Sequence, residues 1–373
     1  MWKKIKFYFF IIAFFSMLIV PQLLYKITSN DKSAYNSENR ILAEKPDFTL
    51  DTIRTYPRLY ENYFNDHVAY KSKFIKFNQM ANYYLFDIVE NDKALLGDND
   101  WLFFKDDYTL EDYQGVCRYT DEQVISIANE IIAVDEYYKS IGIKFVLFIA
   151  PNKESIYGEN LPDKYAQFED YTRADQIYKY LEDNSDVLVV SPKERLRELK
   201  EEYQLYYKYD THWNDIGAYV SSNYLLKAMG MEEMSPLKNV NVYNDGEHIG
   251  DLATMLNLTS IFYKEPEVQL SEFSSVVVTN VYSKPHSIVF NKKYTSDVEN
   301  DLKLYIVGDS FSAKLVEYMK YGFAESTVIH RTQYTPGLAE SEMSNVVVCE
   351  VVERYIDQMA NLSSIFIPTE NGE

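Results

Sequence analysis

Apolar stretches of strand length alternate with helical patterns of apolar residues over most of the chain, from Ala94 onward. The stretch from Ile143 to Ala150 is apolar except for Lys144, as expected for a strand that is buried on both faces. Strands that alternate with helices in this way favour a parallel sheet with helices on both faces. We therefore predict an α/β domain over residues 93–373.

The individual elements follow from the same pattern. The expected strands are Trp101–Phe104, Ile143–Ala150, Val187–Val190, Tyr206–Tyr209, Lys303–Val307, Thr327–His330 and Val346–Glu350. The expected helices are Asp121–Ser140, Arg173–Asn184, Pro192–Tyr203, Asp215–Met229, Phe311–Tyr321 and Glu353–Asn361. Residues 231–299 follow neither pattern clearly, so we interpret them as an insertion.

The N-terminus carries a localisation signal. Lys3, Lys4 and Lys6 precede an apolar run over residues 7–24, which is near the minimum of about 17 residues for a spanning helix. Basic residues on this side favour a cytoplasmic N-terminus. We therefore expect a transmembrane anchor over residues 1–26, with the rest of a single-pass protein outside the cytoplasm at the cell membrane. A cleaved signal peptide is the alternative, because its basic flank and shorter apolar stretch look similar.

Residues 27–92 connect this segment to the α/β domain. They begin as a polar, irregular stretch, which we interpret as a stalk. Aromatic residues then recur at helical spacing between Ile53 and Val89, so one or two amphipathic helices are expected there.

Charge and cysteine content exclude several classes of ligand. The formal net charge is −20, and such a surface repels nucleic acid. Cys117 and Cys349 allow a single disulfide, but neither has the spacing of a zinc ligand. The sequence contains no Walker loop and no GxGxxG motif, so no nucleotide cofactor is expected.

Ser310 is the candidate nucleophile. In Gly308-Asp309-Ser310 it follows an apolar strand and precedes a helical pattern, which places it at the carboxyl end of a parallel strand, where α/β proteins bind ligands. Backbone N–H groups at the start of the next helix can stabilise an oxyanion there. The structural alternative is that Ser310 caps the helix, since serine is a preferred N-cap residue.

Asp210 and His212 are the candidate partners of this serine. A histidine activates a serine hydroxyl by accepting its proton, and a carboxylate fixes the tautomer of the histidine. Residues two apart in an extended segment point to one face, which suits such a pair. Trp213 is expected to form a wall of the site. The same two side chains could instead bind a metal, but no third cluster has convincing spacing, so no metal site is predicted.

The other histidines are weaker candidates for the base. His330 is the most plausible of them, because it ends an expected strand shortly after Ser310. His67 lies in a helical aromatic stretch, His248 in a turn and His286 in a loop. We therefore favour the histidine that has a carboxylate beside it in the sequence.

These residues occur within a series of short motifs that resembles the alginate O-acetyltransferase family, SGNH-hydrolase-like proteins that are also called DHHW proteins. Each motif is weak alone, and their joint order carries the resemblance. In chain order the motifs are Glu38-Asn39-Arg40, Tyr63-Phe64-Asn65-Asp66-His67, Trp101-Leu102-Phe103, Ala150-Pro151-Asn152-Lys153-Glu154, Asp210-Thr211-His212-Trp213-Asn214, Gly250-Asp251-Leu252, Gly308-Asp309-Ser310-Phe311-Ser312 and Val352-Glu353-Arg354.

The resemblance implies an SGNH-hydrolase-like parallel sheet, with Ser310 as the nucleophile, His212 as the base and Asp210 as the residue that orients it. Family members acetylate extracellular polysaccharides, often together with a multi-pass membrane acyltransferase that supplies the acetyl groups. The resemblance therefore implies an extracytoplasmic O-acetyltransferase that acts on a cell-surface or secreted polysaccharide through an acetyl-serine, without a cofactor.

The sequence does not determine which groups donate hydrogen bonds to the oxyanion or which molecule accepts the acetyl group. The usual SGNH glycine and asparagine blocks are not evident, so Asn152 and Arg331 are expected to bind the oxyanion or the substrate. Two other functions are compatible with the same sequence. One is a polysaccharide acetyl esterase, in which water accepts the acetyl group at the same three side chains. The other is a non-catalytic scaffold of a polysaccharide-modifying complex.

Overall fold

In a computed structural model of the chain, the described residues are 2–28, 43–67, 71–86, 88–262, 264–285 and 289–368. The chain divides into a smaller unit, Met1–Glu90 with Ala253–Ile261, and a larger unit, Asn91–Leu252 with Phe262–Glu373. The motif Glu38-Asn39-Arg40 and the candidate His286 lie outside the described residues. All three residues of the predicted Ser-His-Asp site belong to the larger unit.

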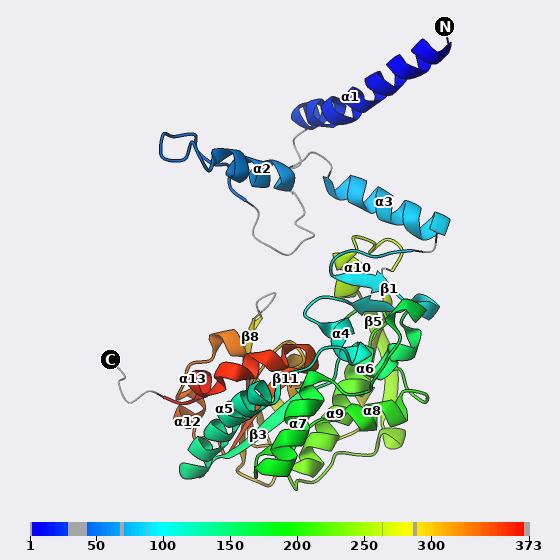
Figure 1. Cartoon of the computed structure of the whole chain (residues 1–373). Coiled ribbons are helices and arrows are strands. Elements are labelled where there is room, and N and C mark those ends of the chain that lie inside the picture. Colours follow the sequence, from blue (N-terminus) through cyan, green and yellow to red (C-terminus); the bar gives the residue numbers. More distant parts are fainter. Residues whose placement is uncertain are drawn as a thin grey trace. The chain divides into compact units, whose positions relative to one another are not determined.

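A seven-stranded sheet forms the centre of the larger unit (Figure 1). The strand order in this sheet is β4-β3-β11-β9-β10-β8-β7. Its strands are β3 (Lys144–Ala150), β4 (Leu188–Val190), β7 (Val278–Pro285), β8 (Phe290–Ser296), β9 (Lys303–Gly308), β10 (Glu325–His330) and β11 (Val346–Val352). The first five strands in that order pair in parallel, whereas β8 pairs antiparallel with both β10 and β7. The predicted parallel sheet is therefore correct for its core and is extended by an antiparallel hairpin. That hairpin lacks a continuous apolar run, since β8 buries only Phe290 and Tyr294.

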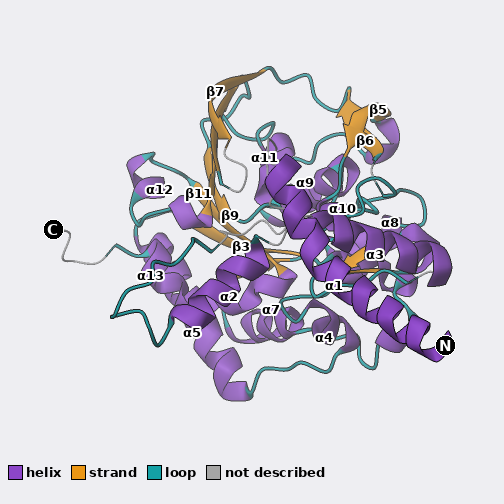
Figure 2. Cartoon of the chain, turned by 90° about the horizontal axis from the view of Figure 1, so that it is seen from above, coloured by secondary structure: helices purple, strands orange, loops and turns teal. Residues whose placement is uncertain are grey.

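Alternate side chains of the central strands enter two cores, one on each face of the sheet. In β3, Val146 and Phe148 belong to one core, and Leu147 and Ile149 to the other. This two-sided burial explains the unbroken apolar run of the strand. The first core is covered by α8 (Lys193–Leu199), α9 (Asp215–Ala228) and α11 (Ser312–Met319), and the second by α5 (Asp121–Ser140), α7 (Arg173–Asn184) and α13 (Leu362–Phe366) (Figure 2).

The larger unit also contains two short strand pairs and several short helices. The antiparallel pairs are β1 (Ala94–Leu96) with β2 (Leu102–Phe104), and β5 (Asn241–His248) with β6 (Glu265–Ser271). The short α-helices are α4 (Thr109–Gln114), α6 (Lys153–Tyr157), α10 (Asp251–Met255) and α12 (Leu338–Ser341). The 3-10 helices are Asp98–Asp100, Gly158–Asn160, Asp163–Tyr165, Leu237–Asn239, Arg331–Gln333 and Glu353–Asn361. The last of these was expected to be an α-helix, and α8 is shorter than predicted. Both cysteines are free thiols.

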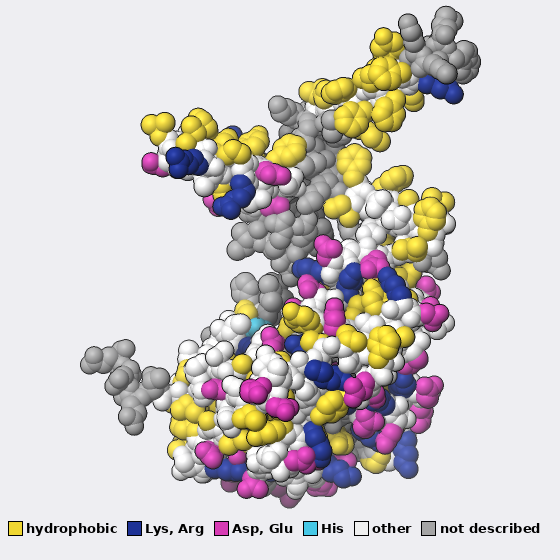
Figure 3. Space-filling view, in the orientation of Figure 1, with side chains coloured by type: hydrophobic (Ala, Val, Ile, Leu, Met, Phe, Trp, Pro, Cys, Tyr) yellow, Lys and Arg dark blue, Asp and Glu magenta, His cyan; other side chains and the backbone are white. Residues whose placement is uncertain are grey.

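Three helices make up most of the described part of the smaller unit: α1 (Trp2–Thr28), α2 (Tyr56–Asp66) and α3 (Lys71–Phe86). Large apolar side chains of α2 and α3 are exposed (Figure 3). Among the described residues, no helix combines the length and the apolar character that crossing a membrane requires. The transmembrane anchor predicted over residues 1–26 is therefore not supported.

Candidate active site

Ser310 lies in the turn between β9 and α11, at the carboxyl end of the strand. Its side chain is exposed, and it does not cap the helix, because the N-cap residue of α11 is Phe311 and no side chain caps that helix. Asp309 holds the turn instead: its Oδ1 accepts a hydrogen bond from Phe311 N at 3.0 Å, and its carbonyl accepts one from Ser312 Oγ at 2.6 Å. The helix-cap alternative for Ser310 is therefore wrong, and its hydroxyl is available for chemistry.

Gly308 allows this turn to lie directly against β11. A Cβ atom at Gly308 would lie 2.4 Å from Oε2 of Glu350 and 2.9 Å from Cβ of Ser312. The same Glu350 oxygen accepts a hydrogen bond from Asp309 N at 2.9 Å. The Oδ2 atom of Asp309 accepts another from Val352 N at 2.8 Å. The backbone on either side of Ser310 is thus fastened to the neighbouring strand.

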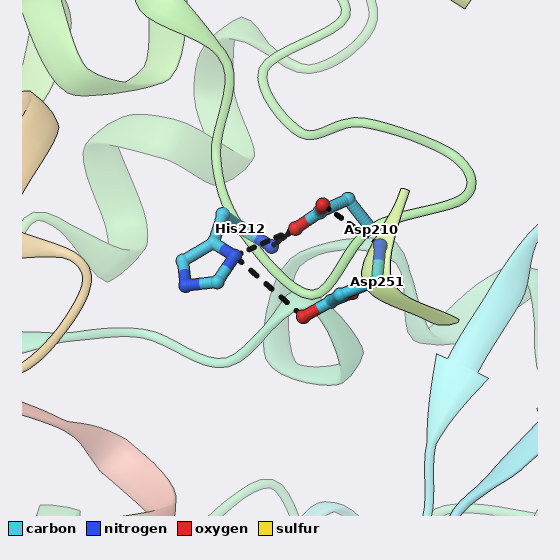
Figure 4. A group of neighbouring side chains, drawn as sticks. All are labelled: Asp210, His212 and Asp251. Carbon is cyan, nitrogen blue, oxygen red and sulfur yellow. Dashed lines mark hydrogen bonds and ion pairs between the residues drawn. The ribbon is translucent and has the colours of Figure 1, made fainter. Parts of the chain in front are cut away.

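His212 lies between Ser310 and Asp210. Its Nε2 is 2.6 Å from Ser310 Oγ, and its Nδ1 is 2.6 Å from Asp210 Oδ1. The backbone N–H of His212 donates to the same carboxylate oxygen at 2.9 Å, which fixes the imidazole and the carboxylate relative to each other (Figure 4). The structure therefore brings together the three side chains that the sequence singles out, in the order that a serine nucleophile, its base and an orienting carboxylate require.

The segment that carries the imidazole and the carboxylate is not the strand predicted over Tyr206–Tyr209. Tyr206 forms only an isolated bridge with Trp213. The Lys208 carbonyl accepts a hydrogen bond from Leu102 N of β2 at 3.0 Å, and side chains satisfy much of the remaining backbone. The Nζ atom of the buried Lys153 donates to three carbonyl oxygens, those of Tyr207 at 3.3 Å, Lys208 at 3.1 Å and Asp210 at 2.6 Å. The apolar and aromatic pattern of the segment therefore reflects a buried loop.

Glu265 and Gly250 shape the same loop. The carboxylate of Glu265, in β6, accepts a hydrogen bond from the N–H of Tyr209 at 2.9 Å. Gly250 leaves room for the loop, because a Cβ atom there would lie 1.8 Å from the carbonyl oxygen of Tyr209. This close approach lets the next residue, Asp251, donate its backbone N–H to Asp210 Oδ2 at 3.0 Å. The Gly250-Asp251-Leu252 motif thus positions the carboxylate of the site.

Asp251 also places a second carboxylate beside the imidazole (Figure 4). One potential metal-ligand atom from each of Asp210, His212 and Asp251 lies within 4.8 Å of the others. These atoms already have protein partners. His212 Nδ1 faces Asp210, and Asp251 accepts hydrogen bonds from the backbone N–H and hydroxyl of Thr211 at 2.8 and 2.7 Å. These hydrogen bonds hold both carboxylates in place beside the imidazole.

The charge states of Asp210 and His212 follow from their contacts. Burial alone raises the pKa of Asp210, but two imidazoles, those of His212 and His248, hold this pKa well below its ordinary value. Burial lowers the pKa of His212, and the charge and hydrogen bond of Asp210 more than offset that effect, so its pKa is raised above 6.5. Asp210 is therefore ionised at neutral pH and stabilises the protonated form of the base.

His248 contacts the site, although the sequence places it only in a turn. Its Nε2 lies 2.9 Å from Asp210 Oδ2, the carboxylate oxygen that His212 does not contact. The two residues are 38 positions apart in the chain, so no local spacing indicates the contact. The sequence could indicate this contact only if the pairing of β5 with β6, which brings His248 to the loop that carries Asp210 and His212, were already known.

Of the two predicted oxyanion residues, Arg331 contacts the turn that carries Ser310, and neither forms a hydrogen bond with Ser310 in the described residues. Arg331 Nη2 donates to Asp309 Oδ2 at 3.0 Å. Its Nη1 is buried and has no hydrogen-bond partner among the described residues. Asn152 is buried, and its Oδ1 accepts a hydrogen bond from Arg354 Nη1 at 3.1 Å. Arg331 therefore retains an unused donor, and in Asn152 the bond from Arg354 uses the acceptor Oδ1, so Nδ2 is the atom that could donate to an oxyanion.

Trp213 does not form a wall of an open site. Its exposed fraction is 0%, and its ring packs against Phe148 and Phe311 in the core. The Phe311 ring in turn lies 4.9 Å from the imidazole of His212, measured between ring centroids. Because the side chain has no exposed surface that a substrate could contact, the predicted substrate role is corrected to a structural one beneath the imidazole of His212.

The alternative base, His330, is engaged elsewhere. Its Nδ1 is 2.8 Å from Thr332 Oγ1, and no hydrogen bond joins it to Ser310 in the described residues. His67 contacts the carbonyl oxygen of Tyr63 through Nδ1 at 2.8 Å, within the smaller unit. Neither histidine therefore competes with His212 for the serine.

The sheet and the three side chains at its carboxyl edge define an α/β protein of the SGNH-hydrolase type. Residues 94–330 match the family described as SGNH hydrolase-like domain, acetyltransferase AlgX. This match covers more than half of the chain, and the protein belongs to that family.

Individual relatives are similar at lower identity. A Pseudomonas syringae pv. tomato protein named probable alginate O-acetylase AlgJ is 25% identical over 247 residues, 59% of this chain and 54% of that protein. The chain thus spans about half the length of this relative.

Two solved structures share the fold. A DHHW family protein from Eubacterium siraeum has a TM-score of 0.58 at 14% identity, and the match covers 76% of this chain and 99% of that one. Bacillus cereus PatB1, in a structure with a sulfonyl adduct, has a TM-score of 0.51 at 14% identity, covering 75% of this chain and 99% of that one. At these identities the likeness extends to the fold alone.

Proposed function

We propose that the protein is an extracytoplasmic O-acetyltransferase that moves an acetyl group to a cell-surface or secreted polysaccharide through an acetyl-serine. The observation that carries this proposal is the 2.6 Å contact between His212 Nε2 and the exposed Ser310 Oγ, with Asp210 on the other ring nitrogen. The AlgX family supports acetyl as the transferred group. The name of the AlgJ relative supports a polysaccharide as the acceptor.

In the first half of the reaction, His212 Nε2 accepts the proton of the Ser310 hydroxyl while Oγ attacks the carbonyl carbon of the acetyl donor. The C–O bond to Oγ forms, and the carbonyl oxygen becomes an oxyanion. We assign its stabilisation to the Ser310 N–H and to Arg331, which has an unused buried donor, with Asn152 as the other candidate. The intermediate then collapses. The donor's leaving group departs with the proton from His212, and an acetyl ester remains on Ser310.

In the second half, a sugar hydroxyl gives its proton to His212 and attacks the acetyl carbon. The bond to Ser310 Oγ breaks, and Oγ recovers the proton from His212. Throughout both halves Asp210 accepts the Nδ1–H bond and stabilises the imidazolium without taking its proton. The product is an acetylated sugar, and the free serine is regenerated.

The acceptor decides between a transferase and an esterase, because water can attack the same acetyl-serine. We expect purified protein given an acetyl ester and an oligosaccharide to form acetylated sugar, with less acetate released than in the sugar-free reaction. The measurement is mass spectrometry of the sugar together with acetate release. A Ser310→Ala sample is the control for spontaneous transfer. Acetate release that is unaffected by any sugar, with no acetylated product, would instead identify an esterase.

We further propose that the domain works outside the cytoplasm, with a multi-pass membrane acyltransferase as the supplier of acetyl groups. The order of basic and apolar residues over 3–24 supports export, as does the resemblance to enzymes of extracellular polysaccharides. Exposed lysines such as Lys179 and Lys227 should then react with a membrane-impermeant amine reagent added to intact cells. A cytosolic protein serves as the unlabelled control, and labelling only after lysis would contradict this placement.

A further inference from the structure

Two imidazoles hold the carboxylate of Asp210. His212 contacts Oδ1, and His248, the last residue of β5, contacts Oδ2 through Nε2 at 2.9 Å. The other ring nitrogen of His248, Nδ1, lies 2.9 Å from Oε2 of Glu267 in β6. No step of the proposed reaction uses His248 or Glu267, so this second set of contacts requires its own explanation.

The geometry determines the charge of His248. A neutral imidazole has one N–H group, so only one of its nitrogens can donate a hydrogen bond. Both nitrogens of His248 face carboxylate oxygens, and ionised carboxylates only accept. The two contacts can both be hydrogen bonds only in the imidazolium. Burial lowers the pKa of His248, but its bonds to Asp210 and Glu267 outweigh burial and raise the pKa to about 9.

The surroundings fix the ring in this orientation. His248 stacks on Tyr207, with ring centroids 3.8 Å apart and 10° between the planes. The other oxygen of Glu267, Oε1, accepts hydrogen bonds from Tyr207 OH at 2.8 Å and Lys314 Nζ at 3.2 Å. The hydrogen bond from His248, followed by that from Tyr207, lowers the pKa of Glu267 to about 2. Glu267 is therefore a fixed anion that orients the ring toward the catalytic carboxylate.

We propose that His248 is a positioning residue that, as an imidazolium, clamps Asp210 and reduces the basicity of His212. This inference rests on the proposed function, in which His212 is the base. The bond to Oδ2 keeps the Asp210 carboxylate from rotating away from His212. The positive charge also weakens the attraction of Asp210 for the His212 proton, so that His212 remains neutral, and able to accept the serine proton, at lower pH.

The charge balance around His248 makes this effect substantial. His248 directly contacts Asp210, Glu267 and the ring of Tyr207. Glu265 is its partner across the β5–β6 pair, Asp251 at the start of α10 donates its backbone N–H to Asp210, and Lys314 of α11 lies behind Glu267. Its own neighbour in β5, Glu247, pairs with Lys264. Most of these groups are acidic. Without the imidazolium, their negative charge would act on the His212 proton with less compensation.

The test follows the protonation of His212 directly. The full-length chain is prepared with 13C-labelled histidine, and His212 is titrated by NMR in the wild type, His248→Gln and His248→Ala. Glutamine can place an amide N–H where Nε2 stood, so it keeps a hydrogen bond to Asp210 without the charge. His67→Gln in the smaller unit is the matched control. The His212 signal is assigned by its loss in His212→Asn.

We expect the titration midpoint of His212 to rise by about half a pH unit or more in both His248 variants, because a nearby positive charge is lost. The midpoint in His67→Gln should stay at the wild-type value. The acid limb of kcat/KM should move upward by the same amount, since activity requires neutral His212. On the plateau above that limb, His248→Gln should keep kcat within about threefold, while His248→Ala should lose about tenfold because Asp210 is no longer clamped.

An unchanged His212 midpoint in His248→Gln, in a protein that still transfers acetyl groups, would overturn this inference and leave the proposed function intact. The reverse result is also distinguishable. If the midpoint rises as expected but the wild type transfers no acetyl group at any pH, the proposed function fails, whereas the action of His248 on the Asp210-His212 pair is supported. Thermal unfolding of each variant separates these outcomes from loss of the fold, and His248→Gln suffices if His248→Ala does not fold.

Discussion

Replacement of Ser310 with alanine is expected to lower acetyl transfer by at least about a thousandfold, because the nucleophile is removed and only the oxyanion donors and bound substrate remain. The free energy of unfolding should change by no more than about 0.5 kcal/mol, since the side chain is exposed and caps no helix. The measurements are the rate of product formation under saturating donor and urea denaturation of the same preparation.

The matched control is Ser341→Ala. Ser341 is also exposed, and its hydroxyl donates only to a local carbonyl, that of Leu338 at 2.8 Å. Its loss should leave the rate of acetyl transfer unchanged. Wild-type acetylation in cells that carry Ser310→Ala would favour the scaffold function. Wild-type acetyl transfer by purified Ser310→Ala would instead reject Ser310 as the nucleophile.

Replacement of Lys153 with methionine should disrupt both stability and activity. The Lys153 side chain is 1% exposed, and its Nζ donates to three carbonyl oxygens of the loop that carries Asp210 and His212. Methionine has a similar length but no donor, so the carbonyls of Tyr207 and Asp210 would lose their charged partner, whereas the Lys208 carbonyl would keep its hydrogen bond from Leu102 N at 3.0 Å. Each buried acceptor left without a partner costs about 1–3 kcal/mol, and relief from burying the ammonium offsets part of this loss. We expect the free energy of unfolding to fall by about 3 kcal/mol.

The rate of acetyl transfer should fall together with stability in Lys153→Met. The loop that carries Asp210 and His212 sets the distance between His212 and Ser310, and a displacement of about 1 Å can cost a hundredfold in rate. Lys227→Met is the control, since the side chain of Lys227 is 70% exposed and its substitution should be neutral in both assays. Urea denaturation and acetyl transfer under native conditions give the two readouts. If Lys153→Met matches the wild type in both, the loop does not depend on this ammonium.

Local patterns were sufficient to predict the central part of the fold. The run Ile143–Ala150 predicts β3 because a strand buried on both faces needs apolar side chains at every position. The segment around Ser310 likewise predicts a strand, a turn and a helix, which places the serine correctly. In both cases the signal lies within a few neighbouring residues, so no knowledge of distant partners is required.

The loop that carries Asp210 and His212 shows why other elements could not be predicted. Tyr206–Tyr209 has the composition of a strand, yet Lys153 binds the carbonyls of Tyr207 and Lys208, and Glu265 binds the N–H groups of Lys208 and Tyr209. Both side chains are more than fifty positions away in the sequence, as their hydrogen bonds record. Local propensity cannot report such partners, because the same aromatic residues suit a buried loop and a buried strand.

The same limit explains why the burial of Trp213 and the contact of His248 with Asp210 could not be predicted. Trp213 follows His212 directly in the sequence, which suggests a place in the site, but burial of its ring in the core is decided by Phe148 and Phe311. His248 reaches Asp210 only because β5 pairs with β6 and returns to the loop. Pairing within residues 231–299 gave no clear pattern in the sequence, so the second imidazole became visible only in the structure.

The most direct test of the account is to locate the covalent intermediate. The protein would be exposed briefly to an activated acetyl ester, quenched in acid and mapped by peptide mass spectrometry, with His212→Ala and Ser310→Ala alongside. We predict one acetyl group on the peptide that contains Ser310, much less of it in His212→Ala and none in Ser310→Ala. Turnover of the ester by the wild type with the acetyl group on a different side chain, and Ser310 unmodified, would contradict the account.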